Sequence, residues 1–226
     1  MTPSDLLPTH LIFDCDGVLV DSEAIAIDVE SRLLTEAGFS ITPSEIADRF
    51  VGLSYASMLS GLEEQFGRPL PVGLIPRIEQ VVRDEFPDRL VAVDGIAGVL
   101  ARSALPRAVA SSSDLDRVHQ SLGLTALDHH FDDALVFSAQ MVDRGKPAPD
   151  LFLLAAERLG ADPARCLVIE DSPHGVTAAL AAGMGVVGLL AGSHAGPSLG
   201  ERLRASGATH IAESSEELNV LLGHDD

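Results

Sequence analysis

Two aspartates separated by one residue follow directly on an apolar run near the start of the chain, in the segment HLIFDCDG at 10–17. On an extended backbone, carboxylates at positions i and i+2 point to the same side, so Asp14 and Asp16 should repel each other. Such a pair requires a nearby cation or a shifted pKa, which indicates a site of chemistry. Gly17 permits a tight turn through which the backbone can approach a ligand. Taken alone, this short pattern also fits an Asp-Gly turn with two solvated carboxylates.

Hydroxyl groups and a lysine lie in two later segments. Ser111, Ser112 and Ser113 come after the apolar run at 108–110, where hydroxyls can bind phosphate oxygens at a helix start. Alternatively, Ser113 or Asp114 caps that helix, and the two readings are compatible because different residues can do each job. Lys146 lies in RGKPAPD at 144–150, a loop stiffened by its prolines. Both segments therefore offer groups that could hold an anion.

A second acidic pair, Glu170-Asp171, follows the apolar run at 167–169. An Asx turn or a helix cap ahead of Pro173 is the alternative for this pair. Together, the ends of the predicted strands supply two carboxylate pairs, a set of hydroxyls and an ammonium group. This combination predicts a hard-cation site for Mg²⁺ beside an oxyanion site. It fits phosphoryl transfer through a covalent aspartyl phosphate.

The elements that must position these groups alternate between strands and helices. The apolar runs LIFDCD, RAVASSS, ALVFSA, CLVIEDS and GVVGLL read as strands, and helical patterns span 114–122, 149–159 and 176–182. This alternation predicts an α/β fold with a doubly wound parallel sheet, a Rossmann-like core. Such sheets bind ligands beyond the carboxyl ends of their strands, where all the groups above would lie.

The interval between the first two strands lacks this alternation. It contains helical patterns at 23–37, 44–50, 55–66 and 74–86, separated by glycines and prolines. We expect these helices to form an inserted cap domain at 22–90, while 1–21 and 91–226 form the catalytic core domain. The hinges would lie at 20–23 and 89–95.

The ordered motifs DCDGVLVDS, SSS, GKPAPD and IEDSPHG resemble those of the haloacid dehalogenase superfamily of phosphohydrolases. The helical insert is similar to the α-helical cap of the β-phosphoglucomutase and phosphoglycolate phosphatase branch. The resemblance implies that Asp14 is the nucleophile and Asp16 the general acid/base. It also implies that Ser111 and Lys146 hold the phosphoryl oxygens, and we place the neighbouring Ser112 in the same phosphate site.

The resemblance also implies a Mg²⁺ cofactor. The ion would lie between Asp14, the backbone carbonyl of Asp16 and Asp171, with Glu170 nearby or bound through water. Because the branch that cleaves carbon–halogen bonds lacks the second aspartate, Asp16 favours a phosphate ester as the substrate.

Substrate choice in this branch depends on the cap, on a loop that should lie near 49–55 here. Arg49 could clamp a substrate carboxylate or second phosphate, or it could be a solvated arginine at a helix end. In the similar enzyme β-phosphoglucomutase, the cap carries a histidine shortly after the first motif and an arginine just after the cap loop. The corresponding positions in this chain look like Ala26 and Tyr55. We therefore expect hydrolysis of a small sugar phosphate or phosphorylated sugar acid. The alternatives are a phosphosugar mutase and, from another class, a receiver-like switch phosphorylated on Asp14.

Composition limits the partners and the location. The formal charge of −19 argues against nucleic acid, and 46% hydrophobic residues suffice for a sizeable core. No run reaches the ~18 apolar residues of a membrane span, and the N-terminus lacks the pattern of a signal peptide. The two cysteines, Cys15 and Cys166, form no disulfide framework and read as buried thiols. We expect a cytoplasmic phosphatase of small phosphorylated metabolites, a monomer, with a dimer as the alternative.

Overall fold

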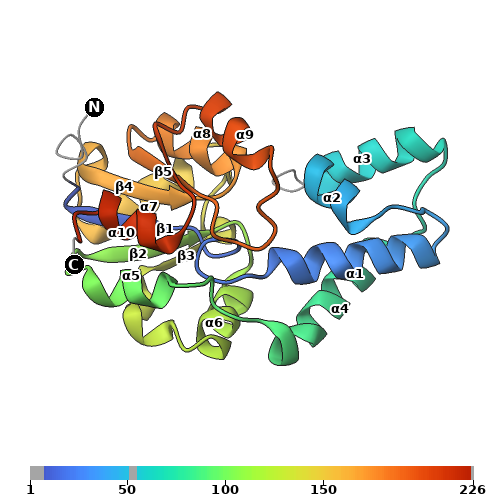
Figure 1. Ribbon diagram of the computed structural model, residues 1–226, viewed down its shortest axis with the longest axis horizontal. Helices are drawn as coiled ribbons and strands as arrows, with labels where there is room; N and C mark the ends of the chain where they lie inside the picture. The colour runs from blue at the N-terminus through green and yellow to red at the C-terminus, as the bar shows by residue number, and fades with distance from the viewer. Residues whose placement is uncertain (1–7, 51–54, 225–226) are drawn as a thin grey trace.

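Six parallel strands form one sheet in the computed structural model, which describes residues 8–50 and 55–224. Their order across the sheet is β3-β2-β1-β4-β5-β6 (Figure 1). The strands are β1 (His10–Phe13), β2 (Arg107–Ser111), β3 (Val136–Ser138), β4 (Cys166–Glu170), β5 (Gly185–Leu189) and β6 (His210–Ala212). The predicted doubly wound parallel sheet is confirmed.

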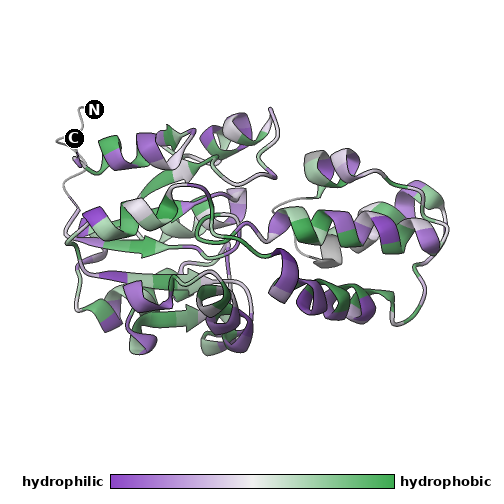
Figure 2. Cartoon of the chain, turned by 60° about the horizontal axis from the view of Figure 1, so that its bottom comes forward, coloured by the Kyte–Doolittle hydropathy of each residue, from purple (hydrophilic) through white to green (hydrophobic). Residues whose placement is uncertain are grey.

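Helices cover both faces of this sheet, which explains why its strands are continuously apolar. Leu11 and Phe13 of β1 belong to one hydrophobic cluster, with α5 (Ile96–Arg102), α6 (Leu115–Leu124) and α10 (Ser215–Leu221). Ile12 belongs to a second cluster, with α7 (Asp150–Leu159), α8 (Pro173–Ala181) and α9 (Leu199–Ala205). Figure 2 shows the hydrophobic strands between helices that carry hydrophilic residues on their outer sides. The sheet therefore has two apolar faces, and its polar groups gather at the strand ends.

The strand order places a crevice beside β1. β1 pairs with β2 on one side and with β4 on the other, and the chain winds in opposite directions from it. Sheets of this order bind ligands at this switch point, outside the carboxyl ends of the strands. The backbone N–H of Asp14 donates to the carbonyl of Ile169 at 3.0 Å, so the ladder holds Asp14 level with the end of β4.

Four helices stand to one side of the sheet in both views (Figures 1 and 2). They are α1 (Glu23–Glu36), α2 (Pro43–Arg49), α3 (Tyr55–Phe66) and α4 (Leu74–Arg89). Each begins and ends within about three residues of its predicted bounds. The two segments that join them to the sheet run side by side, because Asp21 N–H donates to the Val91 carbonyl at 2.9 Å and Val93 N–H donates to the Leu19 carbonyl at 3.0 Å.

Side-chain caps fix the starts of three helices, α2 to one side of the sheet and α6 and α8 after the strands β2 and β4. Thr42 accepts from the N–H of Glu45, whose carboxylate accepts from Thr42 in return, so a capping box starts α2. Asp114 caps α6, and Ser172 caps α8 by accepting from Gly175 N–H at 3.0 Å. Of the two predicted caps for α6, Asp114 is therefore the one used. Ser113 remains available for other contacts.

Both cysteines are buried and unpaired, as the sequence indicates. Across residues 8–50 and 55–224, every helix is too short or too polar to span a bilayer.

We predict that Ile12→Ala lowers the free energy of unfolding by about 2–5 kcal/mol, because Ile12 is fully buried at the centre of the sheet and its loss leaves a cavity. Urea denaturation followed by circular dichroism measures this loss. Val72→Ala is the control, since Val72 is fully exposed and should change stability by less than about 0.5 kcal/mol. Equal effects of the two substitutions would contradict the central position of Ile12.

Candidate active site

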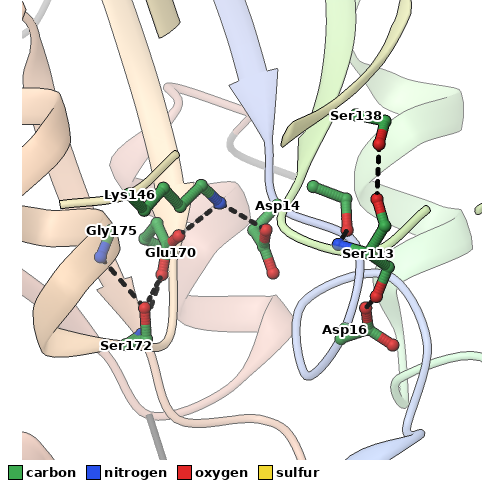
Figure 3. Close-up of polar contacts among 9 residues, drawn as sticks. Asp14, Asp16, Ser113, Ser138, Lys146, Glu170, Ser172 and Gly175 are labelled. Carbon is green, nitrogen blue, oxygen red and sulfur yellow. Dashed lines mark hydrogen bonds and ion pairs between the residues drawn. The ribbon is translucent and has the colours of Figure 1, made fainter. Parts of the chain in front are cut away.

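Asp14 lies buried at the carboxyl end of β1, in contact with an equally buried lysine. Lys146 extends from the loop before α7, and its ammonium group contacts Asp14 Oδ1 and donates to Glu170 Oε1 at 2.7 Å (Figure 3). Its Nζ also lies 4.9 Å from the centre of the Phe152 ring. The buried ammonium group of Lys146 therefore contacts both Asp14, which follows β1, and Glu170, the last residue of β4.

Glu170 is held on both carboxylate oxygens. Its Oε2 accepts from the N–H and the hydroxyl of Ser172, at 2.8 and 2.9 Å, while Oε1 faces Lys146. A Cβ atom on residue 175 would lie 1.7 Å from Glu170 Oε1, so the close packing of α8 on this carboxylate requires Gly175. The segment IEDSPHG thus fixes one side of the lysine contact.

Burial and mutual repulsion shift the ionisation of these groups. Burial raises the pKa of Asp14 well above its usual range, with Lys146 opposing the rise and the neighbouring carboxylates adding to it. For Lys146, burial alone would lower the pKa, but Asp14 and Glu170 raise it above its usual range. Lys146 therefore keeps its charge although its side chain is buried, and it can attract an anion.

Asp16 is directed away from this contact. Its Oδ1 accepts from the Ser22 hydroxyl at 2.5 Å and from Arg117 Nη2 at 3.0 Å, and its Oδ2 accepts from the Ser113 hydroxyl at 2.6 Å. Figure 3 shows its carboxylate directed toward Ser113 rather than toward Lys146. Burial opposes ionisation, but Arg117 and the hydroxyl donors lower the pKa of Asp16 overall. In this arrangement Asp16 is an ionised carboxylate.

The predicted hydroxyl cluster lies beside the two aspartates. Ser111 is buried at the end of β2, and its hydroxyl accepts from the N–H of Ser113 at 3.0 Å. The Ser138 hydroxyl donates to the Ser113 carbonyl at 2.7 Å and so ties this turn to β3. Ser112 is exposed on the chain, yet both Ser111 and Ser112 line the same cavity as Asp14.

Asp171 has a buried histidine as its neighbour. His194 Nε2 lies 3.0 Å from Asp171 Oδ2. Burial would lower the pKa of His194, but Asp171 raises it to about 9, so the pair carries opposite charges. Burial raises the pKa of Asp171, and His194 opposes that rise. Gly17 has φ +78°, and a Cβ there would lie 1.9 Å from Asp171 Oδ2, so only glycine allows this approach.

The acidic residues suit Mg²⁺ by donor type and by charge. Asp14 and Asp171 offer the hard oxygen ligands that Mg²⁺ prefers, and burial, together with the neighbouring Glu170, raises the pKa of both carboxyl groups. In this arrangement Lys146 and His194 contact those carboxylates. Within residues 8–50 and 55–224, no three ligating side chains converge as a ready metal cluster.

These groups form the floor of a cavity of about 540 Å³. The opposite side comes from the helices that follow β1, through residues of α1, α2 and α3. Arg49 does not line this cavity; it is exposed, bonds to Gln65 and lies 4.8 Å from the Phe50 ring. Residues 51–54 of the predicted specificity loop lie outside the described residues.

Three residues of the site carry no assigned role in the sequence pattern. Ser22 ends the first motif, and its position six residues after Asp16 gives no sign of a contact between them. Arg117 reaches Asp16 from α6, and His194 reaches Asp171 from the segment after β5. Only tertiary packing brings these pairs together, so a single sequence carries no signal for them.

Comparison with known proteins agrees with this geometry. The haloacid dehalogenase-like hydrolase family matches residues 11–189. The 6-phosphogluconate phosphatase of Escherichia coli is 29% identical over 91% of this chain and 92% of its own length. The phosphorylated carbohydrates phosphatase of Thermotoga maritima is 30% identical over 93% of this chain and 97% of its own.

A solved structure shares the whole architecture. A conserved haloacid dehalogenase-like protein from Agrobacterium tumefaciens superposes with a TM-score of 0.90 and 38% identity, over 96% of this chain and 98% of that one. The match extends through the sheet and the four helices that follow β1. On the family match, the site and these relatives, the chain belongs to the haloacid dehalogenase-like hydrolases and is a phosphoric monoester hydrolase.

Proposed function

We propose that this hydrolase is a Mg²⁺-dependent phosphatase that cleaves a small sugar phosphate through a phospho-aspartate on Asp14. The observation that carries the proposal is the buried contact between Asp14 and Lys146 at the floor of the cavity. A carboxylate beside a permanent cation, with hydroxyls alongside, can attack phosphorus while its surroundings hold the phosphoryl oxygens. The named relatives act on phosphorylated carbohydrates, which supports this substrate class.

The first half of the proposed reaction forms the Asp14–phosphorus bond and breaks the bond from phosphorus to the ester oxygen. Lys146, Ser111 and Ser112 would hold the phosphoryl oxygens. Asp16 would give a proton to the leaving oxygen, for which it must first take up a proton and turn away from Ser113. In the second half, ionised Asp16 would remove a proton from the water that attacks the phospho-aspartate.

A bound Mg²⁺ would offset the repulsion between Asp14 and the phosphate. Asp14, Asp171 and the backbone carbonyl of Asp16 would hold the ion. Glu170 would act mainly by fixing Lys146, because both its carboxylate oxygens already accept hydrogen bonds.

We also propose that 22–90 form a cap domain on a core made of 1–21 and 91–226. Its two connections to the core would be the segment around Leu19 and Asp21 and the segment around Val91 and Val93, which hydrogen-bond to each other. Movement of the cap would admit the substrate and then exclude water from Asp14.

Hydrolysis is favoured over mutase chemistry by the residue at position 26. Ala26 lines the cavity and offers no side-chain polar group that could retain a sugar phosphate intermediate. The side chain of Tyr55, at the start of α3, lies outside the described part of the chain. Incubation with β-glucose 1-phosphate separates the two reactions, because a phosphatase releases phosphate and a mutase yields glucose 6-phosphate. A receiver-like switch gains no support from membership in a hydrolase family.

We predict that Asp14→Asn lowers the release of phosphate from p-nitrophenyl phosphate with Mg²⁺ by at least ~10⁴-fold, because an amide is not a nucleophile toward phosphorus. Cooperative urea unfolding should persist in this variant. Full activity in a purified, folded Asp14→Asn protein would refute the assignment of the nucleophile.

We predict that Asp16→Asn releases one equivalent of p-nitrophenolate rapidly and then turns over about 10²–10⁴-fold more slowly than the wild type. Nitrophenolate leaves without a proton, whereas attack by water on the phospho-aspartate needs the base. Stopped-flow absorbance measures both phases, and a variant with both aspartates changed to asparagine is the control without a burst. Unchanged steady-state turnover would exclude Asp16 as the base.

We predict that Lys146→Met lowers the free energy of unfolding in EDTA by about 3–5 kcal/mol, because it leaves two buried carboxylates without their shared cation. EDTA prevents a divalent ion from replacing the lost charge. Arg144→Met is the matched control, since its 2.7 Å ion pair with Asp150 is at the surface and should contribute less than ~1 kcal/mol. A loss no larger than that of the control would show that the buried contact is not stabilising.

A further inference from the structure

His194 is a buried histidine that reaches the site from the segment after β5. Its Nε2 lies 3.0 Å from Asp171 Oδ2, and the residue is 7% exposed. Asp171 lines the cavity, whereas His194 is not among the described lining residues. His194 therefore acts on a group bound in the cavity through Asp171 rather than by direct contact.

The contact engages one of the two carboxylate oxygens of Asp171. His194 approaches Oδ2, so Oδ1 remains for another ligand. A carboxylate held in this way keeps one orientation, whereas an unrestrained aspartate side chain changes between rotamers. Polar partners behind a metal-binding side chain commonly fix how that side chain is presented to the ion.

The segment that carries His194 is itself held against the turn after β1. Ser193 N–H donates to Asp21 Oδ1 at 3.1 Å. A Cβ atom on residue 192 would lie 2.9 Å from the Gly17 carbonyl oxygen and 2.7 Å from the ring of His194, so this close packing requires the glycine that is present there. Contacts of the backbone therefore set the position of the histidine.

The same packing lies next to a second group that we propose to hold Mg²⁺. Gly17 directly follows Asp16, whose backbone carbonyl is one of the proposed ligands, and Gly17 N–H donates to the Val20 carbonyl at 2.8 Å. The segment 192–194 thus contacts both Asp171 and the turn that carries the Asp16 carbonyl.

Several carboxyl groups act on the ring of His194. Burial would lower the pKa of His194. Three carboxyl groups oppose that effect and raise the pKa, those of Asp171, Glu23 and Asp21. Because acidic groups outnumber this one base, its charge does not make this edge of the cavity repel a second cation. Orientation of Asp171 is therefore the effect expected of His194.

We propose that His194 is a positioning residue for Mg²⁺, which holds Asp171 through Oδ2 so that Oδ1 can bind the ion. This inference rests on the proposed function, in which Asp171 is a ligand of Mg²⁺. It adds to that site a residue that contacts neither the substrate nor the metal.

Isothermal titration calorimetry of the substrate-free protein with Mg²⁺ alone measures this effect without catalysis. His194→Leu removes the donor from the side chain, whereas His194→Gln keeps an N–H group that can reach Asp171. We expect the dissociation constant for Mg²⁺ to rise at least about tenfold in the leucine variant and to stay within about threefold of the wild-type value in the glutamine variant. His129→Leu is the matched control, since His129 is exposed and does not line the cavity; it should leave the constant unchanged.

Equal binding of Mg²⁺ by the leucine and glutamine variants overturns the inference. Tighter binding by the leucine variant overturns it as well, because His194 would then compete with the ion instead of orienting its ligand. Urea unfolding in EDTA shows whether each variant folds. If the leucine variant does not fold, His194→Asn takes its place, since its shorter amide ends before the position of Nε2 and should also weaken binding at least about tenfold.

The wild type separates failure of this inference from failure of the proposed function. If the wild type binds no Mg²⁺, the proposed Mg²⁺ dependence is overturned and the inference with it. If the wild type binds Mg²⁺ and the leucine variant binds it equally well, only the role of His194 is overturned.

Discussion

Lys146 lies between the carboxylates of Asp14 and Glu170, and the arrangement of the cavity floor depends on this contact. Without Lys146, these two carboxylates could not share the end of a buried sheet, because desolvation and mutual repulsion both oppose their negative charges. With it, Asp14, the nucleophile that we propose, lies directly beside a cation that could bind an anion. The same balance recurs nearby, where Arg117 holds Asp16 and His194 lies beside Asp171. Each acidic group of the floor thus has a basic partner.

Two glycines allow this crowding. Gly17 lets the turn after β1 pass against Asp171, and Gly175 lets α8 pack on Glu170. Neither position tolerates a side chain. The two motifs therefore need glycine there so that the backbone can lie against a carboxylate, in addition to the residues that they supply for chemistry. The parallel sheet supplies the rest, since it brings the ends of β1, β2 and β4 to a single edge.

The sequence predicted the strands and helices whose apolar residues recur at a regular spacing. It did not predict the contacts between residues that lie far apart in the chain. Periodic apolar runs revealed five strands and the four helices of the insert. The edge strand β6, three residues long, and the short helices α5, α9 and α10 lack a strong pattern and were not predicted. The motifs indicated Asp14, Lys146 and Glu170, which the structure brings into contact. Contacts such as that of Arg117 with Asp16 depend on tertiary packing, which no local spacing encodes.

The antiparallel segments joining the four helices to the sheet have a consequence for how such a protein can change. Because the chain leaves and re-enters the sheet at one point, through hydrogen bonds between Asp21 and Val91 and between Leu19 and Val93, its two crossings are adjacent. An insertion anchored in this way can lengthen, shorten or be exchanged without altering strand order or register. Changes in these helices can therefore alter the side of the cavity that they line while the groups at the strand ends stay in place.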